Sequence, residues 1–124
     1  PSEMVETVLR IKKCQNIDTP IIAKGNCGIP RYQEGKIVYS GTPNIMSDYA
    51  LLAFKAGAKI IGGCCGTTPS HIRPMREALE QVSISVSYSV KEHLEKLGEP
   101  WKETNTRKKR IRRSNFIYQK KTIY

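Results

Sequence analysis

Residues 62–69 of the chain read GGCCGTTP, so that two adjacent cysteines, Cys64 and Cys65, stand between glycines. An apolar run precedes this segment and an amphipathic run follows it. The order predicts a strand, a tight turn and a helix, because glycine adopts turn conformations without a Cβ penalty. Thr68 is a suitable N-cap, and Pro69 suits the first helical position, where a backbone N–H has no partner.

Two thiols at the carboxyl end of a strand are candidate ligands for a soft or borderline metal, with zinc first. Successive strand residues point to opposite faces, so the backbone must turn sharply for both sulfurs to reach one point. Two other interpretations are open: small, buried apolar side chains, or a strained disulfide between neighbours. The glycine-rich turn favours Cys64 and Cys65 as metal ligands over both.

Positive charge is concentrated at one end of the chain. Residues 102–124 hold nine Lys/Arg and one Glu, a net charge of +8, whereas residues 1–101 hold twelve Lys/Arg and ten Asp/Glu, a net charge of +2. The tail has no periodicity and is predicted to be disordered. A nucleic-acid-binding tail is an alternative function, because such a run attracts phosphates at low salt. A solvated tail without a specific nucleic-acid partner is favoured.

The 124 residues allow one domain at most. No secretory signal is present, and no apolar run approaches the roughly 20 residues that span a membrane. We therefore expect a reducing, cytoplasmic setting, no membrane partner, and free or metal-bound thiols. The first residue is Pro1 rather than Met, which indicates a fragment or a processed piece.

Hydrophobic periodicity predicts helices over 2–13, from Pro43 to a stop at Gly57, and over 69–81, with short apolar strands over 20–24 and 58–62. Strands that alternate with helices indicate an α/β fold with a parallel sheet. The long connection 31–42 has two open interpretations, a functional loop or a plain surface hairpin. Residues 83–90 alternate with period two, which indicates an extended segment, and 91–97 favour a short helix.

Residues 1–81 resemble the C-terminal part of the homocysteine S-methyltransferase domain. The resemblance rests on IIGGCCGTTPSHI at 60–72, with weaker support from IAKGNCGIP at 22–30 and SGTP at 40–43. Within the family, the chain is most similar to bacterial betaine–homocysteine methyltransferase-like proteins.

The resemblance implies the last two βα units of a (β/α)8 barrel, about a quarter of one. Residues 1–82 would be this barrel part, 83–101 an extended and helical extension, and 102–124 the basic tail. Residues 20–24 would be strand seven and 58–62 strand eight. Two strands leave a barrel open, so we expect the isolated chain to be partly folded or aggregation-prone.

The resemblance also implies one zinc ion per complete barrel, held by three thiolates. Two are Cys64 and Cys65; the third would lie upstream of Pro1, with Cys27 as the less favoured alternative. The homocysteine sulfur takes the fourth position and accepts a methyl group from betaine or a sulfonium donor, giving methionine. The substrate sulfur is the nucleophile, so no catalytic residue is predicted. We expect the fragment alone to be inactive. Either the rest of the barrel is missing from it, or the chain is an inactive remnant of a barrel.

Other candidate groups have structural interpretations. His71 follows the predicted cap and is assigned to capping or packing, and Glu77 and Glu80 to a solvated helix face. His93 lies in a charged stretch and is expected to be exposed or structural. Cys14, near the end of the first helix, is expected to be a buried or half-buried thiol.

Overall fold

The structure is a computed structural model that describes residues 1–14, 19–83 and 85–100. The helices are α1 (Ser2–Cys14), α2 (Pro43–Lys55), α3 (Pro69–Gln81) and α4 (Val90–Leu97); the strands are β1 (Ile22–Gly25), β2 (Pro30–Gln33), β3 (Lys36–Tyr39) and β4 (Ile60–Gly63). The basic tail predicted over 102–124 lies outside the described residues.

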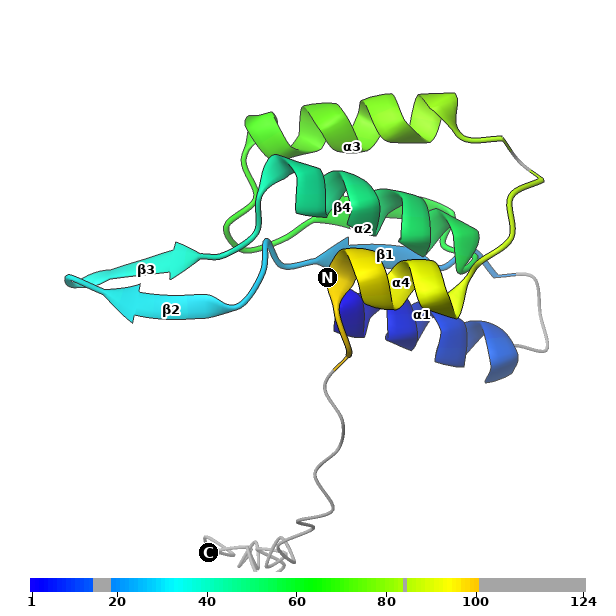
Figure 1. Cartoon of the computed structure of the whole chain (residues 1–124), viewed down its shortest axis with the longest axis horizontal. Coiled ribbons are helices and arrows are strands. Elements are labelled where there is room, and N and C mark those ends of the chain that lie inside the picture. The colour runs from blue at the N-terminus through cyan, green and yellow to red at the C-terminus, as the bar shows by residue number, and fades with distance from the viewer. Residues whose placement is uncertain (15–18, 84, 101–124) are drawn as a thin grey trace, which may run out of the picture.

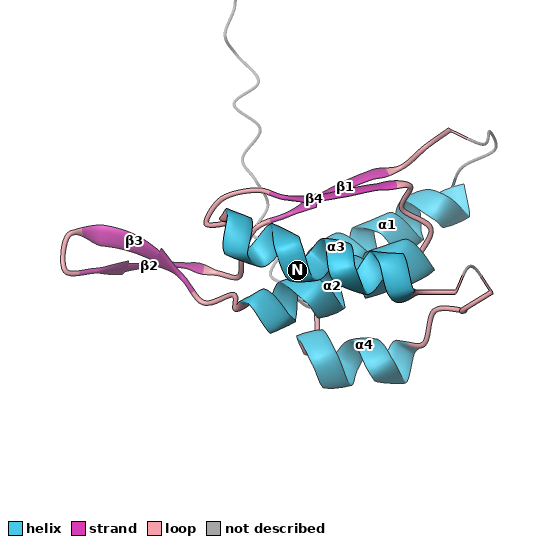
Figure 2. Cartoon of the chain, turned by 90° about the horizontal axis from the view of Figure 1, so that it is seen from above, coloured by secondary structure: helices cyan, strands magenta, loops and turns pink. Residues whose placement is uncertain are grey.

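The two predicted strands form a parallel pair. β1 pairs with β4 in register, with Ile22 opposite Ile60 and Gly25 opposite Gly63. Helices α1, α2 and α3 lie together on one side of this pair (Figures 1 and 2). The prediction of a parallel sheet connected through a helix is confirmed.

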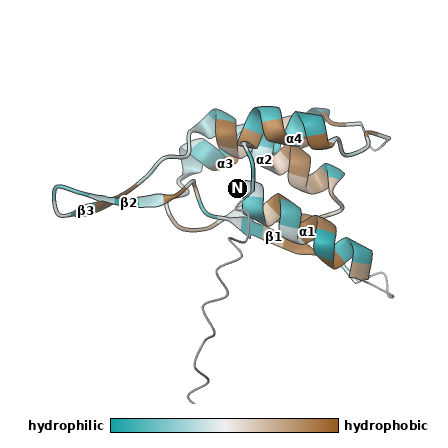
Figure 3. Ribbon diagram, turned by 60° about the horizontal axis from the view of Figure 1, so that its bottom comes forward, coloured by the Kyte–Doolittle hydropathy of each residue, from teal (hydrophilic) through white to brown (hydrophobic). Residues whose placement is uncertain are grey.

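Helix α2 carries the centre of the core. Its Met46, Tyr49 and Leu52 are fully buried and recur at helical spacing. They pack with Val5 and Val8 of α1, while α1 and α4 carry hydrophilic and hydrophobic residues on different faces, as amphipathic helices do (Figure 3).

Local signals set the limits of α2. Thr42 has an extended backbone and its side chain accepts a hydrogen bond from the Ile45 N–H at 3.3 Å, as an N-cap does. Gly57 follows the helix with φ +109°, a left-handed conformation that glycine adopts without strain. Both were expected from the sequence.

The long connection between β1 and α2 is a β-hairpin. β2 and β3 are antiparallel, with Tyr32 opposite Ile37, and the hairpin projects from the body of the molecule (Figure 1). Both strands are exposed apart from Tyr39 at the base, which is half-buried. The surface-hairpin interpretation is confirmed.

The segment 83–90, which was expected to be extended with one face buried, forms no strand in the part that the structure describes. Its described residues contain a turn and irregular backbone, with Val86 39% exposed. Alternation alone does not make a strand, because a ladder also needs a free neighbouring edge. Here the chain runs past the helices, and only Tyr88 is partly buried against the core.

Helix α4 packs on α2, and this corrects the expected exposure of His93. The His93 side chain is 2% exposed and bonded to two side chains, Ser2 Oγ at 2.8 Å from Nε2 and the Tyr88 hydroxyl at Nδ1. Lys55 of α2 meets both carboxylate oxygens of Glu92, at 2.9 and 2.8 Å. His93 is therefore structural and buried, because α4 docks through it.

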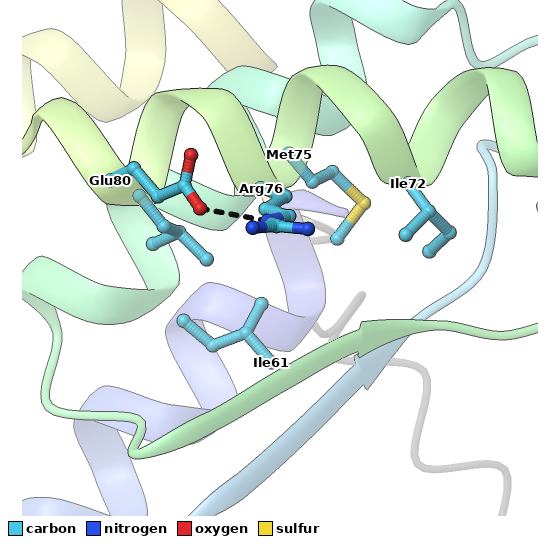
Figure 4. A pocket seen from close by; sticks show the side chains of 6 residues that line it. Ile61, Ile72, Met75, Arg76 and Glu80 are labelled. Carbon is cyan, nitrogen blue, oxygen red and sulfur yellow. Dashed lines mark hydrogen bonds and ion pairs between the residues drawn. The ribbon is translucent and has the colours of Figure 1, made fainter.

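Away from the helices the sheet is uncovered by the described residues. Ile22 and Ile60 are 59% and 55% exposed on the same face. Beside β4, a pocket of about 340 Å³ opens between the strand and α3, lined by Ile61, Ile72 and Met75 among others (Figure 4). Within the part of the chain that the structure describes, no helix is long and apolar enough to cross a membrane.

Candidate metal centre

Cys64 and Cys65 lie directly after β4, where the parallel strands end. Both side chains are exposed, and their sulfurs are 3.8 Å apart. This separation is far longer than the roughly 2.05 Å of a disulfide bond. The structure thus brings together the two thiols that the sequence singled out, and both are reduced.

Backbone hydrogen bonds join the two loops that follow the strands. The Cys64 N–H donates to the Gly25 carbonyl at 2.8 Å, and the Cys27 N–H donates to the Cys65 carbonyl at 2.9 Å. The turn closes when the Thr67 N–H donates to the Cys64 carbonyl at 3.1 Å. The cysteine pair is therefore held by its backbone, while its sulfurs face solvent.

Cys27 takes a different position. Its side chain is 1% exposed and its thiol lies 3.4 Å from the Gly41 carbonyl oxygen, to which it donates. Gly41 N–H in turn donates to the Cys27 carbonyl at 2.9 Å. Burial raises the pKa of the Cys27 thiol, which favours the neutral form over a metal-binding thiolate. Through these two hydrogen bonds, Cys27 joins the loop after β1 to the base of the hairpin.

No group of three or more potential metal ligands forms among the residues that the structure describes. Cys64 and Cys65 are two such groups, and Cys27 does not join them. Further ligands for a metal at this position would have to come from outside the described residues.

Tyr39 reaches the cysteine turn from the base of the hairpin. A Cβ added at Gly66 would lie 2.3 Å from Tyr39 Cγ, so the ring rests directly on the Gly66 backbone. The pKa of Tyr39 is raised, first by burial, then by the charge of Cys65 and a hydrogen bond with its side chain, and then by Cys64. The sequence flagged the connection 31–42 as a candidate functional loop but gave no signal for this residue.

The Tyr49 ring packs against Gly25, the last residue of β1. A Cβ at Gly25 would lie 2.9 Å from Tyr49 Cζ, so only glycine leaves room for the ring at the end of β1. Burial raises the pKa of Tyr49 to about 12. Its buried hydroxyl approaches the Gly25 backbone without a well-formed hydrogen bond among the described residues.

The open face of β1 and β4 extends to the carboxyl ends of the strands, which the cysteines follow. Lys24 is exposed and stands opposite Gly62, and the exposed Asn26 directly follows β1. In the described part of the chain Lys24 makes no ion pair. A cationic and an amide side chain are therefore exposed near the carboxyl end of β1.

The remaining candidates are structural. His71 Nδ1 accepts a hydrogen bond from the Thr68 N–H at 3.2 Å, which confirms the capping role. Glu77 and Glu80 are exposed, and Glu80 pairs with Arg76. Cys14 is exposed, contrary to expectation, because it is the last residue of α1 and lies on its solvent side.

Comparison with known proteins places this site in a family. The family model of homocysteine S-methyltransferases matches residues 1–79. The chain is 33% identical over 84 residues to methionine synthase of Mycobacterium tuberculosis, which covers 66% of the chain and 7% of that protein. It is 37% identical over 68 residues to S-methylmethionine–homocysteine S-methyltransferase of Rattus norvegicus, covering 54% of the chain and 19% of that protein.

A shorter match is closer in sequence. The chain is 56% identical over 34 residues to betaine–homocysteine S-methyltransferase 1 of Danio rerio, covering 27% of the chain and 8% of that protein. The chain thus spans less than a fifth of the length of these relatives. With the family match over more than half of its residues, the chain belongs to the homocysteine S-methyltransferase family.

Proposed function

We propose that this chain supplies the carboxyl-terminal βα units of a (β/α)8 barrel in which a zinc ion at Cys64 and Cys65 activates homocysteine for methylation. The observation that carries the proposal is the pair of exposed sulfurs, 3.8 Å apart, at the carboxyl end of parallel strands in a chain of this family. In barrel enzymes the active site lies at this end of the strands.

The spacing of the thiols suits zinc. Two sulfurs bonded to one tetrahedral zinc at about 2.3 Å each are separated by about 3.8 Å. The Cys64 and Cys65 sulfurs have this separation. Two further ligands would complete the tetrahedron: one thiolate from outside the described residues and the substrate sulfur.

Zinc would hold the homocysteine sulfur as a thiolate at neutral pH, where a free thiol with a pKa of about 8.5 is mostly protonated. The substrate sulfur would take the methyl group of an onium donor, with the new carbon–sulfur bond forming as the bond to the donor nitrogen or sulfur breaks. Names of the relatives mention betaine and S-methylmethionine as donors. Methionine is the product.

In this scheme the chain's own residues position the reaction rather than perform it. Cys64 and Cys65 would hold the metal that binds the substrate sulfur. Lys24 and Asn26 are exposed near the carboxyl end of β1. The uncovered face of β1 and β4 is the face that a closed barrel would turn inward. We expect methyl transfer from a complete barrel and not from these 124 residues alone.

The test is the zinc content of the chain, purified under reducing conditions and dialysed, in matched cysteine variants. With the rest of the barrel supplied, we expect near one zinc per complete barrel in the wild type and in Cys14→Ser, which replaces an exposed thiol at the end of α1. Zinc should be lost in Cys64→Ser and Cys65→Ser, and retained in Cys27→Ser. Zinc that persists in both pair variants, or that never binds even with the rest of the barrel present, contradicts the proposal.

A further inference from the structure

The cysteine turn has a neighbour that does not belong to either strand. Tyr39, at the base of the hairpin, lies on Gly66, where an added Cβ would be 2.3 Å from Cγ, 2.4 Å from Cδ2 and 2.8 Å from the Tyr39 Cβ. Gly66 has φ +78°, so its backbone turns towards the ring in a conformation that other residues rarely adopt. Contact between the two is therefore built into the local backbone.

The same side chain lies beside the cysteine pair. Its ring rests on Gly66, the residue directly after Cys65, and the two thiols contribute to raising the pKa of the Tyr39 hydroxyl. The backbone of the turn is fixed by hydrogen bonds, but the two thiols are exposed and have no other described side chain to orient them. A phenol that donates to a thiolate is the kind of outer-shell partner that orients metal ligands in proteins.

The base of the hairpin is itself held in place. The Ile29 N–H donates to Ser40 Oγ at 3.2 Å, and Gly41 bonds to Cys27 on the loop after β1. A Cβ at Gly28 would lie 2.5 Å from both Gly41 N and Ser40 Oγ, so the two strands of chain are in close contact. Tyr39 is thus carried by a rigid attachment, while the far end of the hairpin is free of the body.

We propose that Tyr39 is a positioning residue: its ring on Gly66 fixes the cysteine turn, and its hydroxyl donates to a neighbouring thiolate, so that the thiol pair keeps the spacing that a metal needs. The inference rests on the proposed role of Cys64 and Cys65 as metal ligands. It assigns the hairpin a function in this family member, namely to support the metal ligands from outside the barrel strands.

Tyr32 provides a matched control. It lies on the same hairpin, two residue pairs from the base, and is 77% exposed with Ile37 as its cross-strand neighbour. Tyr32→Ala removes an equal side chain without touching the cysteine turn. Tyr39→Phe is the second control, because it keeps the ring on Gly66 and removes only the hydroxyl.

The experiment uses two measurements on the full chain. In metal-free protein labelled at glycine, NMR follows the Gly66 Hα that faces the ring. In a titration with Co²⁺, the thiolate-to-cobalt absorption gives both the affinity and the energy of the charge-transfer band. Circular dichroism checks that each variant keeps its helices.

Tyr39→Ala should abolish the upfield ring shift at Gly66 and weaken Co²⁺ binding by about tenfold, the lower end of the range for lost outer-shell partners. Tyr39→Phe should keep the ring shift but move the charge-transfer band, which a purely structural role would not do. Tyr32→Ala should change neither. If Tyr39→Ala binds Co²⁺ as tightly as Tyr32→Ala, and Tyr39→Phe leaves the band unmoved, the inference is overturned and the proposed metal site stands.

The opposite failure is distinguishable. If the wild type gives no thiolate-to-cobalt band even with the rest of the barrel present, the proposed function and the metal-positioning role fall together, whatever the NMR shows. If the Gly66 ring shift is absent from the wild type, the contact itself is wrong and the inference falls even where Co²⁺ binds.

Discussion

Gly66 and Tyr39 show how one residue type determines the geometry of the candidate site. Gly66 has a left-handed φ of +78°, and the Tyr39 ring occupies the space that a Cβ at Gly66 would need. Gly62, four residues earlier, has neither constraint: its φ is ordinary and nothing lies within 4 Å of an added Cβ. The two glycines of the same motif therefore have different reasons to be glycine.

We predict that Gly66→Ala destabilises the chain by about 1–3 kcal/mol, because the backbone is strained and the Tyr39 ring is displaced. Gly62→Ala should cost less than about 1 kcal/mol, since alanine fits the strand backbone and the open space. Urea denaturation of both variants measures the difference. Equal costs at the two positions would show that the Tyr39 contact is not formed.

At this scale the sequence predicts the ligand pair and the capping histidine, since each depends on near neighbours. Cys64, Cys65 and His71 all lie within one strand–turn–helix unit. The role of Tyr39 depends on a contact with Gly66 across 27 positions, made by the way the hairpin folds back, and spacing carries no signal for that. The burial of Cys27 could not be predicted from the sequence either, because it depends on the contact between Cys27 and Gly41 in the folded chain.

Helix α4 illustrates the element scale. It binds to the body through one polar network and one set of ion pairs. His93 Nε2–H donates to Ser2 Oγ, whose hydrogen goes to the Gly98 carbonyl at 2.8 Å, and the Tyr88 hydroxyl donates to Nδ1. This arrangement uses the neutral ring. Protonation of the ring would turn Nδ1 from an acceptor into a donor that faces the Tyr88 hydroxyl in a buried site, so the bond that this hydroxyl donates would be lost.

We predict that docking of α4 weakens in mild acid. Burial is the main cause that lowers the pKa of His93 from 6.5, although Glu6 and Glu3 oppose it. The unfolded chain therefore takes up a proton at a higher pH than the folded protein, so this stability is fully present above about pH 6.5 and is lost as the pH falls through the folded pKa.

The measurement is the free energy of unfolding at about pH 7.5 and about pH 5.5, for the wild type and His93→Gln. The wild type should lose more stability than the variant, which has no ring to protonate. An identical loss in both proteins would assign the acid sensitivity to other groups.

Element boundaries were predictable where caps and periodicity agree. The third predicted helix, 69–81, has the bounds of α3, because Thr68, Pro69 and the apolar spacing all favour the same start. The alternation of residues 83–90 indicated an extended segment with one face buried, whereas the described residues there form a turn and irregular backbone in which only Tyr88 is partly buried. Strand formation is a property of two segments, whereas a helix satisfies its own backbone.

In the part of the chain that the structure describes, the sheet has one covered and one uncovered face. Helices α1, α2 and α3 bury one side of β1 and β4, and Ile22 and Ile60 remain on the other (Figure 2). The free edge of β4 and the apolar pocket beside α3 add to the open surface (Figure 4). In the proposed barrel the remaining strands would cover this surface, and without them we expect it to associate with itself.

We predict that the isolated chain self-associates through this face. Replacing Ile22 and Ile60 together by Thr should reduce the association, because two large apolar side chains leave the exposed face while the strands keep β-branched residues. Val90→Thr is the control, since Val90 is 64% exposed but lies on α4. Sedimentation velocity at several concentrations measures the effect. Equal association of the double variant and the control would place the contact elsewhere.

The most direct test of the central claim is the absorption spectrum of the Co²⁺-loaded chain during titration with homocysteine. If Cys64 and Cys65 hold a metal that accepts the substrate sulfur, the thiolate-to-cobalt band should grow and saturate with homocysteine, and should not respond to methionine, whose sulfur carries a methyl group. A spectrum that ignores homocysteine, or that responds equally in Cys64→Ser, would contradict the account.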